Sequence, residues 1–143
     1  EGVHKGKSAS VKMWDYKKSY LMHGASYVKP VVMRYSVSKR RLTIGDSSYK
    51  VKDYPDFPWK KGNYDIEIPD FPHSGGHAYL KESKKATVWF RVGHSGERYI
   101  HTGNYSLGCI TLTEHRRWDK LYSRLIKARK GDGISVGVLK VVN

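Results

Sequence analysis

The sequence has one cysteine among its 143 residues, so no disulfide can form within the chain. It has no run approaching the roughly 20 apolar residues of a membrane helix, and we therefore expect no membrane span. Acidic residues are also scarce, 13 against 27 Lys and Arg, and the resulting charge of +14 normally implies an acidic partner. The chain begins with Glu1 rather than Met, which we interpret as a processed or trimmed terminus.

Aromatic residues, in contrast, make up 13% of the chain, and this content together with the length predicts one folded domain. The charge is unevenly distributed. Residues 62–113 hold five basic and five acidic residues, so the whole excess lies in the flanking segments. The central segment, which carries the candidate chemistry described below, is neutral.

Residues 1–30 show no clear period, which predicts an N-terminal arm or linker before a domain at 31–143. From residue 31 onward, short runs rich in β-branched and aromatic residues are separated by turn residues, a pattern typical of strands. We expect an ordered loop over 53–63 and a second from 69 to 76. The predicted strands are 31–37, 41–44, 49–51, 64–68, 86–92, 98–100, 109–112 and 134–142, with a turn at 45–48.

One segment predicts a helix. Apolar residues recur at helical spacing from Trp118 to Ile126, Thr113 is the candidate N-cap, and Gly131 lies just past the end. Many strands, one helix and a last strand predict a mostly β domain with one packed helix, built as a sandwich or barrel.

The candidate chemistry lies in residues 99–112, where a strand ends near His101, a Gly/Asn/Ser loop follows, and Cys109 opens the next strand. A nucleophilic thiol needs a neighbouring imidazole to take its proton, and His101 could supply it. A backbone carbonyl near Thr102 or Gly103 would hold the imidazole in one tautomer. The alternative is that Cys109 is a buried core residue and His101 an ordinary strand-end histidine.

The loop before Cys109 suits acyl-transfer chemistry. Gly108 lets the backbone approach a substrate closely, and the amides of Leu107, Gly108 and Cys109 could stabilise an oxyanion. Ser106 could brace this turn. We expect Ser106 and Leu107 to contact substrate as well.

These residues resemble the motif of the L,D-transpeptidase (YkuD-type) catalytic domain, in which a histidine after a strand is followed by Ser/Thr-His-Gly-Cys. Here the motif stands as Ile100-His101-Thr102 and Ser106-Leu107-Gly108-Cys109-Ile110. Residues 61–66 are similar to the family's Pro-x-Gly-x-Phe/Tyr-x-Ile strand entry, and the resemblance covers roughly 31–142. Leu107 replaces the second histidine of the motif and Thr111 an arginine, which indicates a divergent member.

The resemblance implies that Cys109 is the acyl-accepting nucleophile, His101 the general base, and the Thr102 carbonyl the group that orients it. The implied substrate is a peptidoglycan stem peptide, cleaved by transpeptidation, D-amino-acid exchange or L,D-carboxypeptidase chemistry with no cofactor. The implied location is the periplasm, the cell wall or the exterior. A secreted antibacterial effector of this type would have an immunity protein as partner.

Two other features are weaker candidates. His73 and His77 flank two glycines, which argues against a metal-binding helix, and we expect no metal site; His77 and Tyr79 are instead expected to contact substrate. The basic face of the helix, residues 116–130, lacks any accompanying nucleic-acid motif, so we do not expect nucleic acid as the partner. The rival interpretation is a non-catalytic basic module that binds cell-wall polymer or nucleic acid.

Overall fold

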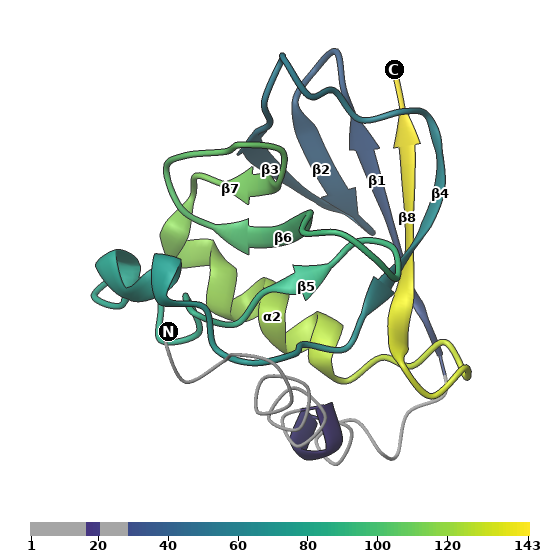
Figure 1. Ribbon diagram of the computed structural model, residues 1–143, viewed down its shortest axis with the longest axis vertical. Helices are drawn as coiled ribbons and strands as arrows, with labels where there is room; N and C mark the ends of the chain where they lie inside the picture. Colours follow the sequence, from purple (N-terminus) through teal and green to yellow (C-terminus); the bar gives the residue numbers. More distant parts are fainter. Residues whose placement is uncertain (1–16, 21–28) are drawn as a thin grey trace.

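The computed structural model describes residues 17–20 and 29–143 (Figure 1). The predicted N-terminal arm falls largely on residues 1–16 and 21–28, which lie outside the described residues, and residues 17–20 are helical. Eight strands form one sheet. They are β1 (Val31–Ser36), β2 (Arg41–Ile44), β3 (Ser47–Lys52), β4 (Gly62–Glu67), β5 (Phe90–Arg91), β6 (Tyr99–Thr102), β7 (Ile110–Leu112) and β8 (Ser135–Val142).

The strand order is β4-β8-β1-β2-β3-β7-β6-β5. Most neighbours are antiparallel, while the β1–β8 and β6–β7 pairs are parallel. An isolated antiparallel bridge joins Ile66 of β4 to Val92, just after β5, so the two edges of the sheet meet. The sheet is therefore a nearly closed barrel, which confirms the predicted mostly β fold class.

Buried and exposed side chains alternate along β1, as expected for a strand with one face toward the core. In β1, Met33 and Tyr35 are fully buried and their neighbours are exposed or half-buried. Strands β6 and β7 are buried at every position. Ile100, Ile110 and Leu112 belong to the hydrophobic core, and Trp89 stacks on His101. Figure 1 shows β5, β6 and β7 beside the strands β1, β2 and β8.

The predicted helix is present as α2 (Trp118–Ile126) and buries its apolar stripe, including Trp118 and Leu121, in the core. The prediction of Thr113 as its N-cap is wrong. A 3₁₀ turn, η2 (His115–Arg117), precedes the helix, and the Thr113 hydroxyl instead donates to the carbonyl of Lys50. The helix also ends at Ile126, earlier than Gly131 suggested.

The prediction of a strand over residues 86–92 is largely wrong, since only Phe90–Arg91 pairs in the sheet. Residues before Phe90 form turns, and the indole N–H of Trp89 donates to the Ala86 carbonyl at 3.0 Å. The loop expected from Pro69 continues into a 3₁₀ helix, η1 (Ser74–Tyr79). The strand β3 begins at Ser47, so the preceding turn is shorter than predicted. Within the described part of the chain, no helix is long and apolar enough to cross a bilayer.

Candidate active site

The parallel pairing of β6 and β7 brings the candidate residues together. Ile100 pairs with Ile110 and His101 with Thr111, so Cys109, one residue before β7, lies level with Tyr99. Since side chains alternate across a strand, Cys109, Thr111 and His101 project from the same face. Strand spacing and rise place Cys109 and His101 roughly 8 Å apart at their Cα atoms, diagonally across the two strands.

Both side chains line a cavity of about 300 Å³. Other walls come from Tyr79 of η1, from Trp89 before β5, and from the β6–β7 loop. Leu107 of this loop is 81% exposed and also lines a second cavity of about 460 Å³, beside Phe57, Trp59 and Arg98. The loop that carries the cysteine motif therefore separates two cavities.

His101 is held in one orientation. Its Nδ1 donates to the carbonyl oxygen of Thr102 at 2.8 Å, which leaves Nε2 as the proton-accepting nitrogen of the neutral ring. Burial lowers the pKa of His101 to about 4, and the bond to Thr102 only partly opposes this effect. Nε2 lies 3.3 Å from the hydroxyl of Thr111, which itself donates to the Tyr105 carbonyl. The ring is thus an uncharged base at neutral pH.

Cys109 is in a neutral state as well. Burial raises the pKa of its thiol, although the Tyr99 amide and the charge of Arg98 act in the opposite direction. The sulfur accepts the Tyr99 N–H at 3.4 Å, and the thiol points to the Glu97 carbonyl at 3.7 Å. Among the described residues the thiol makes no hydrogen bond to His101. The pair is therefore a thiol and an imidazole that share a cavity, not a preformed ion pair.

The turn before Cys109 has a defined conformation. Gly108 has a φ of 135°, and a Cβ there would lie 2.8 Å from the Phe57 ring, so only glycine fits. The Ser106 hydroxyl accepts the Gly108 N–H and donates to the Cys109 carbonyl. Ser106 thus braces the turn, and it occupies the Gly108 amide, which leaves the amides of Leu107 and Cys109 as the candidate oxyanion donors.

Arg98 ties this turn to the rest of the molecule. Its Nε donates to the Gly108 carbonyl at 2.8 Å, and its terminal nitrogens reach the carbonyls of Phe57 at 2.6 Å and Pro58 at 3.5 Å. The guanidinium lies 3.9 Å from the Phe57 ring and 3.8 Å from the Trp59 ring. Nothing in the sequence marked Arg98, because its partners are 10 to 41 residues away.

The structure separates the other predicted site residues. Tyr79 lines the cavity with Cys109, and its hydroxyl accepts the Asn104 N–H at 3.2 Å. His77 is exposed in η1 and is not among the residues that line this cavity. Trp89 and Thr111, which sequence reasoning did not select, both contact His101. A lone tryptophan in an apolar run gives no signal of such a role.

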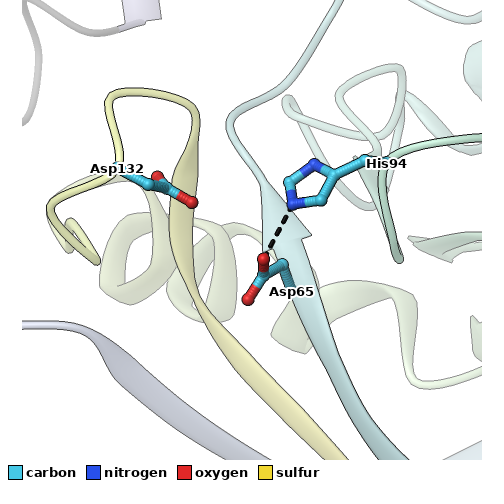
Figure 2. Close-up of side chains that lie close together, drawn as sticks. All are labelled: Asp65, His94 and Asp132. Atoms are coloured by element: carbon cyan, nitrogen blue, oxygen red, sulfur yellow. Dashed lines mark hydrogen bonds and ion pairs between the residues drawn. The ribbon is translucent and has the colours of Figure 1, made fainter.

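A second cluster of polar residues lies away from the cysteine, and Figure 2 shows its members Asp65, His94 and Asp132. Their ligand atoms lie within 4.8 Å of one another. His94 binds Asp65 and Glu67 through its two nitrogens, at 2.7 Å each, and these bonds raise its pKa. Lys130 occupies the other oxygen of Asp65 at 2.5 Å. Asp132 accepts hydrogen bonds from the amides of Ile134 and Ser135, so the protein's own groups occupy these carboxylates. The bonds of His94 to β4 anchor the β5–β6 loop.

No protein-family model and no curated protein matches the sequence. Solved structures do match. L,D-transpeptidase 3 from Mycobacterium tuberculosis, in complex with a faropenem-derived adduct, aligns with a TM-score of 0.53 at 16% identity, over 79% of this chain and 60% of that one. L,D-transpeptidase 1 from the same organism gives 0.53 at 18% identity, over 79% and 61%. An L,D-transpeptidase from Mycobacterium smegmatis gives 0.50 at 13% identity, over 79% and 58%.

The described chain therefore has the L,D-transpeptidase fold, as the resemblance of the sequence predicted. It spans about three fifths of the length of these structures. Their low identity makes the likeness one of fold alone.

Proposed function

We propose that this protein is a cysteine-dependent acyltransferase or peptidase that acts on peptidoglycan stem peptides, with Cys109 as nucleophile and His101 as general base. The observation that carries the proposal is the shared cavity. Cys109 and His101 project into it from adjacent parallel strands, and the Thr102 carbonyl leaves Nε2 of His101 as a proton acceptor. The fold, which is that of L,D-transpeptidases, supports the same chemistry.

The neutral resting state determines how the first step would run. The Cys109 thiol turns from the Glu97 carbonyl toward His101, and Nε2 takes the proton as sulfur attacks the amide carbonyl of the substrate. The imidazolium that forms can donate its Nε2–H to the Thr111 hydroxyl, whose own proton already bonds the Tyr105 carbonyl. Thr111 thereby stabilises the charged base without giving up its other bond.

The oxyanion of the tetrahedral intermediate would be stabilised by the amides of Leu107 and Cys109. Collapse of the intermediate breaks the amide bond, and His101 gives its proton to the departing amine of a terminal D-amino acid. The acyl group is then a thioester on Cys109. An amine acceptor gives transpeptidation or D-amino-acid exchange, and water gives L,D-carboxypeptidase activity. The second cavity beyond Leu107 would place an acceptor next to the thioester.

The biological setting is part of the proposal. We infer action on the cell wall, in the periplasm or outside the cell, and a secreted effector with an immunity protein is one form that such an enzyme takes. The exposed basic residues of α2 and its C-cap, among them Lys120, Arg124 and Lys127, would attract anionic wall polymers. The rival function is a non-catalytic basic binding module in which Cys109 is structural.

The test incubates the protein with purified tetrapeptide muropeptides and a free D-amino acid and reads the products by mass spectrometry. Loss or exchange of the terminal D-residue, or dimer formation, is expected for the wild type and is abolished in Cys109→Ala. His101→Ala should reduce the rate on the order of 10² to 10⁴-fold. Cys109→Ser is the matched control for packing, since it retains shape but loses thiolate reactivity. Turnover that survives Cys109→Ala would refute the enzyme proposal.

A further inference from the structure

The segment His73-Ser-Gly-Gly-His77, which the proposed reaction leaves without a role, packs against Trp89. The imidazole of His73 stacks on the Trp89 ring with centroids 4.4 Å apart and planes 3° apart. His101 stacks on the same indole at 3.9 Å and 15°. Two imidazoles this close to one indole centroid cannot share a face without overlapping. Trp89 is therefore held between the candidate general base and His73.

The two glycines of the segment make this packing possible. A Cβ at Gly75 would lie 3.1 Å from the Trp89 ring, and a Cβ at Gly76 would lie 2.1 Å from the Ala86 carbonyl oxygen. The same Ala86 oxygen accepts the indole N–H at 3.0 Å. Glycine at both positions therefore lets η1 close over the indole and over the carbonyl that anchors it.

His73 is itself anchored by buried groups. Its Nε2 lies 2.7 Å from Asp70 Oδ1, and the other oxygen of Asp70 accepts the Tyr99 hydroxyl at 3.1 Å. Asp70 is 2% exposed. Burial alone would raise the pKa of Asp70, but its bond to His73 and the charges of His73 and Arg91 hold it below its usual value. Asp70 is thus an ionised anchor.

These contacts form a closed circuit that starts and ends on β6. Tyr99 of β6 bonds Asp70, Asp70 bonds His73, His73 stacks on Trp89, and Trp89 stacks on His101, two residues after Tyr99. The Tyr99 ring also meets the rings of His73 and Trp89 edge-on, at 4.7 and 5.7 Å. Strand β6 therefore carries both the candidate base, His101, and Tyr99, whose hydroxyl bonds Asp70.

We propose that Trp89, braced by His73 and Asp70, is a positioning residue that fixes the plane of the His101 imidazole for proton transfer. The bond from Nδ1 to the Thr102 carbonyl fixes one direction of the ring but permits tilt about that bond. Stacking on a braced indole removes the tilt and keeps Nε2 directed along the β6–β7 pair, next to Thr111. A small misplacement of a general base can cost about 10²-fold in rate, so the support has a kinetic effect.

This inference rests on the proposed function for its kinetic consequence, whereas the state of the imidazole can be measured without turnover. The test compares Trp89→Leu, Trp89→Phe and the control Trp118→Phe. Trp118 is also a buried tryptophan whose indole donates to a carbonyl, that of Lys85 at 2.8 Å. Trp118→Phe therefore removes an indole hydrogen bond in the core, as Trp89→Phe does, but at a residue that makes no ring contact with His101.

The first readout is the titration of the His101 imidazole by NMR of labelled histidine. Burial sets the pKa of His101 at about 4, so Trp89→Leu, which lets water reach the ring, should raise it by one unit or more. Trp89→Phe should change it by less than half a unit, and Trp118→Phe should leave it unchanged. Titratable groups near the ring are Cys109 in the cavity, Tyr79 across it and His73 behind the indole.

The second readout is turnover of the tetrapeptide. Trp89→Leu should lower kcat about tenfold or more with KM within twofold, and Trp89→Phe should restore most of the rate because it keeps a stacking ring. His73→Ala, at a partly exposed position, should lower kcat in the same way but by a smaller factor. It replaces Trp89→Leu in the test if that variant does not fold. His73→Phe keeps a ring that can stack on Trp89 but loses the bond to Asp70, so its kcat should lie between those of the wild type and His73→Ala.

The results separate the two proposals. An unchanged His101 titration in Trp89→Leu and His73→Ala, or an equal effect of Trp118→Phe, would overturn the positioning role. Turnover that survives Cys109→Ala would overturn the proposed function. A shifted His101 titration in Trp89→Leu would even then show that Trp89 positions the His101 imidazole.

Discussion

Replacing Arg98 should loosen the turn that presents Cys109. The guanidinium donates two short hydrogen bonds to carbonyls, at 2.8 Å to Gly108 and 2.6 Å to Phe57, and lies within 4 Å of two aromatic rings. Hydrogen bonds from a charged group contribute about 1.5 kcal/mol each at the low end, and each cation–π contact about 0.5 kcal/mol. After a discount for partial exposure, Arg98→Ala should lower the free energy of unfolding by about 3 kcal/mol.

The charge of Arg98 has a second effect, which can be measured separately. Burial raises the pKa of Cys109, and Arg98 partly opposes this. Removing the charge should move the pH midpoint of iodoacetamide alkylation of Cys109 upward. Arg98→Lys keeps the charge but loses the planar fork, so it should lose most of the stability with a smaller shift of the alkylation midpoint.

The assays are urea unfolding followed by tryptophan fluorescence and alkylation rates measured between pH 6 and 10. The control is Arg34→Ala on β1, an exposed position for which we expect a change below 0.5 kcal/mol, as is usual for surface substitutions. The reasoning is refuted if Arg98→Ala unfolds within 0.5 kcal/mol of the wild type, or if Arg98→Ala and Arg98→Lys give the same alkylation midpoint.

Three further predictions concern stability. Hydrogen bonds to Asp65 and Glu67 raise the pKa of His94 above 6.5. The stability that protonated His94 gives the fold is therefore complete below pH 6.5 and is lost as the pH rises through the raised pKa. The difference in unfolding free energy between wild type and His94→Gln should shrink from pH 6 to pH 9. Asp119 accepts hydrogen bonds from the Ser83 hydroxyl and the amides of Lys84 and Lys85. Asp119→Ala should therefore lower the free energy of urea unfolding by about 2 to 3 kcal/mol. The control Asp56→Ala, at an exposed position, should lower it by less than about 0.5 kcal/mol. Gly137→Ala would place a Cβ 2.1 Å from the Val31 carbonyl and should cost about 3 kcal/mol, whereas Gly96→Ala, with open space and a φ of 80°, should cost only about 1 by thermal unfolding.

The sequence predicted the elements whose patterns are local. The alternation in β1, the run that forms β8 and the apolar stripe of α2 each lie within one segment, and each element formed within a few residues of its predicted bounds. The motif around Cys109 was sufficient to indicate the L,D-transpeptidase fold, which the solved structures share.

Elements determined by distant partners were not predictable. Residues 86–92 have strand composition, yet Trp89 is drawn out of a ladder by its bond to Ala86 and by the histidines on its two faces. Thr113 looks like an N-cap, but the Lys50 carbonyl on β3 takes its hydroxyl. Arg98 and Thr111 likewise act on groups that only the pairing of β6 and β7 brings near. The catalytic roles of Cys109 and His101 remain predictions.

The protonated state of Cys109 bears on how the protein tolerates oxidants. Peroxide and related oxidants attack the thiolate, and burial keeps this thiol in the protonated form at neutral pH. A cysteine activated in advance by an imidazolium would be converted to sulfenic acid while it waits for substrate. In the proposed reaction the thiol becomes reactive only when it turns toward His101, so we expect the protein to retain its single sulfhydryl through long exposure to air without an added reductant.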